Sequence, residues 1–343
     1  MNGEFVEGLV DESEAGEFEK VQGVICPGFI NCHCHLELSH LKGLIPEHTG
    51  LVDFVIEVMQ KRFGYSENEM HVAMLDAIEE MGNDGIVAVG DISNTSVSLE
   101  IKQKSSLEWI NFVEVSGIVA PVAEKRLAEA KKVYDIFIEH GMKAFLVPHA
   151  PYSVSPELFG LLNLPQNLAS IHNQENRDED KLFMEGTGDF IRLYQALGVE
   201  VNFNPTFNSS LKSWLPQLDK AERIISVHNT FTGTADIEFS SGRPGIYFCI
   251  CINANRYIEN AVPPVSSFPF DRIVIGTDSL ASNHSLSIRR ELHAIKNSFP
   301  GIEWETLLGW ATINGARALG IDDRFGSFEK GKRPGIAFMD ITV

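Results

Sequence analysis

The sequence predicts an α/β protein whose main domain is a (β/α)8 barrel similar to a TIM barrel. Short apolar runs rich in β-branched residues alternate along the chain with longer amphipathic runs, which indicates parallel β/α units. There are eight of these short runs, and eight strands close a barrel. A doubly wound sheet, the rival fold, typically has a glycine-rich phosphate loop after its first strand, and the first run here has none.

The predicted strands share an apolar body and polar residues at or near the end. In chain order they are VICPGFINCHCH (24–35), GIVAVGDIS (85–93), INFVEVSG (110–117), KAFLVPHA (143–150), LASIHNQ (168–174), RIISVHN (223–229), IYFCICIN (246–253) and DRIVIGTDS (271–279). Between them, apolar residues recur with helical spacing in LVDFVIEVMQKRF (51–63), EKRLAEAKKVYDIFIEHG (124–141) and SIRRELHAIKNSF (287–299). The barrel is expected to span residues 25–320.

The two ends of the chain do not follow the barrel pattern. Residues 1–24 and 321–343 contain short strand-like runs separated by turns. We expect them to pair as a small β-sandwich beside the barrel. This sandwich would be reduced, because only about 25 residues precede the first PGF stretch.

The charge balance narrows the classes of partner. The 343 residues include 28 Lys and Arg against 47 Asp and Glu, a formal net charge of −19. Such a field repels nucleic acid and anionic membranes, so we expect a small-molecule substrate and no nucleic-acid or membrane partner. No apolar run approaches the roughly 18–20 residues of a membrane span, and the acidic N-terminus does not resemble a signal peptide. We therefore expect a cytoplasmic protein whose oligomeric state is open, with a homodimer as one option.

Histidine is concentrated at the predicted strand ends. Of the 11 His residues, five lie there: His33, His35, His149, His172 and His228. In a β/α barrel the carboxyl ends of the strands form one rim, which carries the catalytic side chains. Each His alone is more simply explained as a polar residue with a partner, but a set that meets at one rim needs a common explanation.

Two carboxylates join this set. Asp278 lies at the end of the last predicted strand, and Glu175 follows His172 by three residues. Taken alone, Asp278 could cap the next helix and Glu175 could be one more charge in an acidic loop. Neutral imidazoles with one carboxylate and an open position describe a catalytic site for one divalent ion, with zinc preferred and iron as the alternative. An ion of this kind lowers the pKa of a bound water to about 7. Asp278 would then accept the proton of the attacking water, and Glu175 would protonate the substrate and the leaving group.

The Cys residues are interpreted as packing residues. Successive side chains of a strand point to opposite faces, so if His33 and His35 point into the barrel, Cys32 and Cys34 point outward under the helices. The two Cys residues of the 246–253 strand would lie inward or beneath helices. A zinc site with four thiolates needs close Cys pairs on flexible turns, which these strands do not provide. The five Cys residues also do not indicate a disulfide framework.

Several motifs resemble those of the amidohydrolase superfamily, in its deaminase and chlorohydrolase branch. PGFINCHCHLE is similar to the branch's first-strand motif PGF-x-N-x-H-x-H, and PHAPYSVSPELF is similar to its fourth-strand motif. HNQE resembles the fifth-strand H-x-x-E, and GTDSLASNHSLS resembles the eighth-strand motif. ATINGARALGI and GSFEKGKRPGIAFMD resemble the closing helix and the return into the β-sandwich. The motifs are colinear and cover most of residues 20–343.

This resemblance implies a set of roles. The implied metal ligands are His33, His35, His172 and Asp278. His228 would orient the attacking water, Glu175 would shuttle protons and His149 would contact the substrate. Sister branches hold two metals with a carboxylated Lys at the end of the fourth strand, where this chain has LVPHA, so a single ion is expected.

Within the branch, three stretches look most like aminodeoxyfutalosine deaminases and the adenosine and S-adenosylhomocysteine deaminases. They are HLELSHLKG, HNTFTGTADI and CINANRYIEN. The likeness implies hydrolysis of the 6-amino group of an adenine nucleoside. Candidate pocket residues beside His149 are Glu37 and Asn253, followed by His40, Asn255 and Arg256. Each could instead pack or cap a helix, and CICINAN lacks the Pro that relatives tend to carry after the Cys.

Two other functions stay open from the sequence. The same mononuclear site could serve a cyclic amide hydrolase or a chlorohydrolase, although Glu175 favours deamination because an amino leaving group and a ring nitrogen need a proton donor. A non-catalytic scaffold on the same barrel is the third option. Such scaffolds typically lack some ligands, whereas this chain has the full set.

Overall fold

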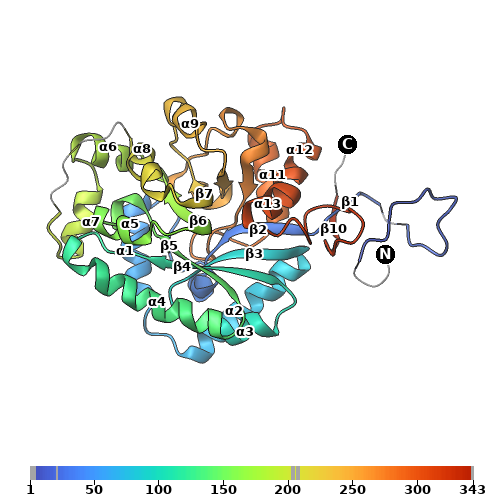
Figure 1. Cartoon of the computed structure of the whole chain (residues 1–343), viewed down its shortest axis with the longest axis horizontal. Helices are drawn as coiled ribbons and strands as arrows, with labels where there is room; N and C mark the ends of the chain where they lie inside the picture. The colour runs from blue at the N-terminus through green and yellow to red at the C-terminus, as the bar shows by residue number, and fades with distance from the viewer. Residues whose placement is uncertain (1–4, 21, 202–204, 206–208, 341–343) are drawn as a thin grey trace.

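Eight parallel strands form the centre of the molecule, which confirms the predicted barrel (Figure 1). The computed structural model describes residues 5–20, 22–201, 205 and 209–340. The barrel strands are β2 (Phe29–Cys34), β3 (Ile86–Ser93), β4 (Glu108–Val115), β5 (Lys143–Pro148), β6 (Gln166–Asn173), β7 (Ala221–His228), β8 (Ile246–Ile250) and β9 (Ile273–Ile275). They pair in parallel as two groups of four, β2 to β5 and β6 to β9.

The two groups of strands meet at two seams, and both seams end at predicted site residues. Between β5 and β6, the backbone N–H of His172 donates to the carbonyl of His149 at 3.0 Å. Between β9 and β2, Cys34 and Asp278 form an isolated parallel bridge, and the N–H of Asp278 donates to the carbonyl of His33 at 3.1 Å. Closing the barrel therefore also brings residues of the candidate site together.

Helices surround the strands (Figure 1). The α-helices are α1 (Leu51–Lys61), α2 (Glu67–Asn83), α3 (Leu99–Lys104), α4 (Ala123–Glu139), α5 (Pro156–Leu162), α6 (Arg177–Glu185), α7 (Phe190–Ala196), α8 (Ser210–Trp214), α9 (Thr234–Ser240), α10 (Ile252–Glu259), α11 (Ile288–Ser298), α12 (Trp304–Gly309) and α13 (Gly315–Leu319). Shorter helical turns are η1 (Leu36–Leu41), η2 (Ala120–Val122), η3 (Pro151–Ser153), η4 (Leu215–Leu218), η5 (Val265–Ser267), η6 (Phe270–Arg272) and η7 (Trp310–Asn314). In the described part of the chain, no helix combines the length and apolar character needed to cross a membrane.

Sequence spacing located the helices better than the strand ends. The predicted strand 24–35 divides into β1 and β2, and β9 ends at Ile275, three residues before Asp278. The predicted helices 51–63, 124–141 and 287–299 correspond to α1, α4 and α11. The predicted strand 246–253 stops at Ile250, because α10 begins two residues later and buries Ile252 and Ile258 on one helical face. Asn253 therefore lies on a helix and not in a strand.

The apolar core has two layers, and the Cys residues are divided between them. The inner layer draws residues from all eight barrel strands, and α13 adds to it. Cys32 belongs to this inner layer together with Cys249, so the prediction that Cys32 points outward is wrong. Cys34 lies in the outer layer between strands and helices, as predicted. The pairing of β2 with β3 changes register between Asn31 and Cys34, so strict alternation of faces fails inside this segment.

The two ends of the chain pair beside the barrel. β1 (Val24–Cys26) and β10 (Ala337–Met339) form a two-stranded antiparallel sheet. Farther toward the N-terminus, Val6 is buried and exchanges backbone hydrogen bonds with Lys332 and Gly331 (2.9 and 2.8 Å). Figure 1 shows these segments on one side of the molecule. Residues 1–4, 21 and 341–343 of the predicted β-sandwich lie outside the described residues, and its boundaries stay a prediction.

Candidate metal centre

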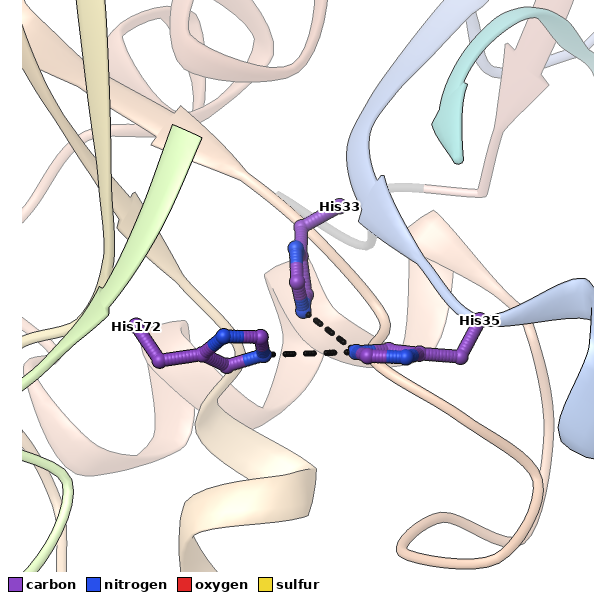
Figure 2. A group of neighbouring side chains, drawn as sticks. All are labelled: His33, His35 and His172. Atoms are coloured by element: carbon purple, nitrogen blue, oxygen red, sulfur yellow. Dashed lines mark hydrogen bonds between the residues drawn. The ribbon is translucent and has the colours of Figure 1, made fainter. Parts of the chain in front are cut away.

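Three imidazole rings and one carboxylate meet at the carboxyl-terminal rim of the barrel. Figure 2 shows His33, His35 and His172 with ring nitrogens turned toward one another. His35 Nε2 lies 3.1 Å from His33 Nε2 and 3.3 Å from His172 Nε2. Asp278 Oδ1 completes the group, 3.5 Å from His33 Nε2 and 3.2 Å from His35 Nε2. The structure thus brings all four predicted metal ligands together.

These four distances, 3.1–3.5 Å, are close to those between ligand atoms of one divalent ion. Ligand atoms that each lie about 2.0–2.1 Å from zinc are about 3.3–3.4 Å from one another. Facing Nε2 atoms can share only one proton per pair, whereas a cation at their centre satisfies every lone pair. Three imidazoles and one carboxylate are a donor set for zinc, and also for iron. Among the described residues, three groups of side chains could hold an ion, and none of them includes a Cys.

The protonation of the ligands favours metal binding. Burial lowers the pKa of His35 to about 4 and lowers the pKa of His172 well below its usual value. Burial alone would raise the pKa of Asp278, but the hydrogen bond with His33 and the neighbouring imidazoles outweigh it and hold that pKa well below its usual value. At neutral pH the site therefore offers neutral imidazoles and an ionised carboxylate.

Glu175 and His228 lie next to the ligands. His228 Nε2 is 3.5 Å from Glu175 Oε2, and its Nδ1 is 2.8 Å from Asn255 Oδ1 on α10. Both side chains are almost fully buried. Burial, followed by the charges of Asp278 and Glu259, raises the pKa of Glu175 well above its usual value, whereas burial lowers the pKa of His228 to about 4. Burial therefore favours the protonated form of the Glu175 carboxyl group.

Two of the site residues, His228 and Asp278, have unusual backbone conformations that orient their side chains. His228 and Asp278 have left-handed φ angles of 73° and 57°. Val227 belongs to the inner layer of the barrel, so continued alternation would send His228 outward; the left-handed residue turns it back to the site. Gly276 allows close packing here, because a Cβ at this position would lie 2.9 Å from the Cβ of His33.

A second group of side chains near the site could in principle hold a metal ion. Glu114, His149 and His172 form a further possible ion-binding group. However, Nδ1 of His172 lies 2.8 Å from the carbonyl oxygen of His149 and donates its proton there. Lys143 Nζ lies 3.3 Å from Glu108 at the start of β4, away from the rim. The number of ions that the site holds stays a prediction.

A cavity of about 470 Å³ opens onto the site. Its polar floor includes His35, Glu114, His149, His172, Glu175, His228 and Asp278. Farther out, its wall is apolar and comes largely from α1 and α7, including Phe54, Val55 and Leu193. Arg62 and Arg126 also line it. The volume and the mixed apolar and polar lining are those of a small-molecule pocket.

The predicted substrate contacts occupy different places. His149 lines the cavity, and its Nδ1 lies 2.6 Å from Ser153 Oγ. Glu37 does not line it; its carboxylate accepts hydrogen bonds from the backbone and hydroxyl of Thr95 at 3.1 Å. Asn253 does not line it either, and its amide donates to Glu291 Oε1 at 2.8 Å. The roles predicted for Glu37 and Asn253 stay untested, but both side chains have other partners.

The three further candidate pocket residues, His40, Asn255 and Arg256, have different partners. Asn255 holds His228, as described above. Arg256 donates to Ser298 Oγ at 2.6 Å, and the ring of His40 lies 4.8 Å from that of Tyr65. Of the three, Asn255 alone has a side-chain bond to a predicted catalytic residue in the described part of the chain.

Sequence reasoning missed Glu114. It lies near the end of β4 and faces the cavity between His149 and His172. The rule that selected the His residues, a polar residue at a strand end, would also have selected this Glu in INFVEVSG.

Comparison with known proteins agrees with this geometry. The sequence model of the amidohydrolase family matches residues 24–342. An adenosine deaminase of Helicobacter pylori is 27% identical over 327 residues, which cover 90% of this chain and 77% of that protein. An aminodeoxyfutalosine deaminase of Nitratiruptor sp. is 26% identical over 329 residues, covering 93% of this chain and 79% of the relative.

Solved structures share the fold. The Helicobacter pylori aminofutalosine deaminase in complex with methylthio-coformycin aligns with a TM-score of 0.79 at 24% identity, covering 94% of this chain and 81% of that one. An adenosine deaminase from Xanthomonas campestris with bound zinc aligns with a TM-score of 0.69 at 22% identity, covering 94% and 73%. Because the family model spans nearly the whole chain, this protein belongs to the amidohydrolase family and is a hydrolase of that family.

Proposed function

We propose that this protein is a metal-dependent deaminase that hydrolyses the 6-amino group of an adenine nucleoside-type substrate. The observation that carries the proposal is the position of Glu175. This buried carboxyl group, with its raised pKa, lines the same cavity as three of the four predicted ligands, His35, His172 and Asp278, and lies 3.5 Å from His228. A deaminase needs a protonated acid there, because the ring nitrogen and the amino leaving group must both gain a proton.

The ligand residues supply the rest of the chemistry. An ion held by His33, His35, His172 and Asp278, with zinc preferred, would lower the pKa of water enough for attack at neutral pH. Asp278 and His228 would orient that water, and Asp278 would accept its proton. Glu175 gives its proton to the ring nitrogen as oxygen adds to the neighbouring carbon. When the tetrahedral carbon collapses, the proton taken up by Asp278 passes to the amino group, the proton of the newly added hydroxyl returns to Glu175, and ammonia leaves.

Size and lining support a nucleoside-type substrate. The polar floor can bind the heterocycle, and the apolar wall from α1 and α7 can cover a less polar extension. Arg62 and Arg126 lie where an anionic group on such an extension would be favourable. The names of the two relatives, an adenosine deaminase and an aminodeoxyfutalosine deaminase, support the same class.

The test is an ammonia-release screen with zinc-reconstituted protein. The panel includes adenosine, 5′-deoxyadenosine, methylthioadenosine, S-adenosylhomocysteine, guanine, cytosine and amino-triazines, and the chelator-treated protein is the control. We expect ammonia from at least one adenine nucleoside and none after metal removal. Activity on guanine, cytosine or a triazine alone would keep deamination but reject the adenine class. No ammonia from any compound, with turnover of a cyclic amide or a chlorotriazine, would favour the alternative hydrolases.

A further inference from the structure

Glu114 has an unusual environment in the candidate active site. Its side chain is only 8% exposed, yet it lines the cavity beside the metal ligands. Oε2 accepts a hydrogen bond from the side-chain amide of Asn94 at 3.1 Å. Oε1 is buried and has no hydrogen-bond partner among the described residues. A buried acceptor without a partner is costly, so such an atom in a pocket indicates a donor that arrives with the ligand.

Neighbouring protein groups do not supply this donor. His172 Nδ1 lies 3.5 Å from Oε1, but that nitrogen donates its proton to the carbonyl of His149. A ring nitrogen of His149 also lies near Glu114, but it forms no hydrogen bond with Oε1, and Nδ1 of His149 lies 2.6 Å from Ser153 Oγ. Arg126 lines the same cavity, and its ion pair is with Glu129 on its own helix. Glu114 therefore lines the cavity while Oε1 has no donor among these neighbours.

A chain of hydrogen bonds holds Glu114 in place. The carboxylate of Glu37 accepts the backbone N–H groups of Asn94 and Thr95, at 3.3 and 3.1 Å. This fixes the loop after β3, and Asn94 in turn binds Oε2 of Glu114. Glu37 thus supports the position of Asn94, which explains why a buried acid directly after the metal-binding motif does not itself line the cavity. Such supported side chains are typical of groups that must keep a fixed geometry.

We propose that Glu114 is a substrate-binding residue whose Oε1 accepts a hydrogen bond from a neutral O–H or N–H group of the substrate. The inference rests on the proposed deaminase function and adds one specificity contact to it. A nucleoside offers two sources of donor, the sugar hydroxyls and the base amino group, and both have the chemistry that Oε1 requires. A substrate with an acceptor or an anion in this position would be rejected, because it would face an unpaired carboxylate.

The test compares Glu114→Gln and Glu114→Ala with the wild-type protein on adenosine and its 2′-deoxy, 3′-deoxy and 5′-deoxy derivatives. Glu238→Gln, an exposed acid on α9, is the control for loss of one negative charge. We expect both Glu114 variants to lower kcat/KM for adenosine by about 10- to 100-fold, mainly through KM, with metal content unchanged. If a sugar hydroxyl is the donor, the matching deoxy compound loses the effect. If all three deoxy compounds behave as adenosine does, the donor is the base amino group.

Two results would overturn the inference alone. One is wild-type activity with unchanged kcat/KM in both Glu114 variants. The other is a loss of metal or of kcat that is equal for all compounds with KM unchanged, which would make Glu114 a positioning residue for His172. If the wild-type protein releases no ammonia from any of these nucleosides, the proposed function fails first and the inference fails with it.

Discussion

The two halves of the barrel bring side chains to the same rim by different means. In the half formed by β2 to β5, site residues such as His35, Glu114 and His149 have no left-handed φ angle. In the half formed by β6 to β9, His228 and Asp278 are left-handed, and so is Gln174, directly before Glu175. Non-glycine residues in this region cost about 1–3 kcal/mol each, so the second half bears strain that the surrounding structure must stabilise.

Buried polar groups provide that stabilisation in the second half. The amide of Gln174 donates to Asp180 Oδ1 at 3.0 Å and to Asp236 Oδ2 at 2.8 Å, and its backbone N–H donates to Glu179 Oε1 at 2.9 Å. These acids come from α6 and α9, outside the barrel. The backbone before Glu175 is thus held from several sides.

The first half has a different support, a buried ion pair. Lys102 on α3 reaches Asp91 on β3 at 2.6 Å, and neither side chain is exposed. The other oxygen of Asp91 accepts the backbone N–H of Leu36 at 2.8 Å, directly after His35. In the first half, a buried ion pair therefore holds strand ends with ordinary backbone conformations. In the second half, hydrogen bonds between an amide side chain and acidic side chains hold residues with left-handed backbone conformations. Each half supplies two of the predicted metal ligands, and these four residues lie beside the two seams at which the halves join.

The largest expected effects come from two residues of the second half, one predicted to bind the metal and the other predicted to transfer protons. Asp278→Asn should remove metal and abolish turnover, because it takes away the charged ligand. Glu175→Gln should lower kcat by at least about 1000-fold while metal stays bound, because only the proton donor is lost. Ammonia release, metal analysis and circular dichroism measure the three quantities. Full activity of Glu175→Gln would reject its role as proton donor.

The next effect tests the support of the first half. Lys102→Met should lower the free energy of unfolding by about 3–5 kcal/mol, because Asp91 is left charged and buried without a partner. The double variant Lys102→Met/Asp91→Asn should recover most of that loss, since the Asn side-chain oxygen can still accept the N–H of Leu36. Urea denaturation at fixed zinc concentration measures both. Equal instability of the single and double variants would show that the charge is not what supports this half.

A smaller effect concerns the aim of His228. Asn255→Ala should lower kcat by about 10- to 100-fold with metal retained, because Nδ1 of His228 loses its partner. Asn253→Ala, on the same helix but bonded to Glu291, is the matched comparison and should change kcat/KM by less than about 3-fold. A large increase in KM for Asn253→Ala would instead support its predicted contact with the substrate.

A further effect is a pH dependence of stability from the network around Gln174. Burial raises the pKa of Glu179 to about 8 in the folded protein, against 4.5 as its ordinary value. Its contribution to stability is therefore fully present below about pH 4.5 and is lost as the pH rises toward 8. Glu179→Gln removes this titration. The free energy of unfolding of the variant should therefore rise relative to that of the wild type as the pH increases from 5 to 8. Denaturation curves across this pH range measure the difference in unfolding free energy, and Glu238→Gln, at an exposed position, is the control. A difference between Glu179→Gln and the wild type that does not change with pH would contradict the prediction.

The sequence predicted the scaffold and the metal ligands because both depend on local pattern. Alternating apolar runs located the eight strands, and His33, His35, His172 and Asp278 lie at strand ends that the barrel topology must bring to one rim. Strand alternation failed at Cys32, where the pairing of β2 changes register, and it would have turned His228 outward. Both failures arise from backbone geometry that only packing against neighbouring strands decides.

The sequence by itself thus determined a barrel of the amidohydrolase family and the residues able to hold a divalent ion. Tertiary structure alone decided which polar side chains reach the cavity. Glu37 and Asn253 have the chemistry of substrate contacts but bind Thr95 and Glu291, while Glu114 lines the cavity and has one carboxylate oxygen without a partner among the described residues. The reason is physical: residue type sets what a side chain can bind, but the partners within its reach decide whether that capacity is already used.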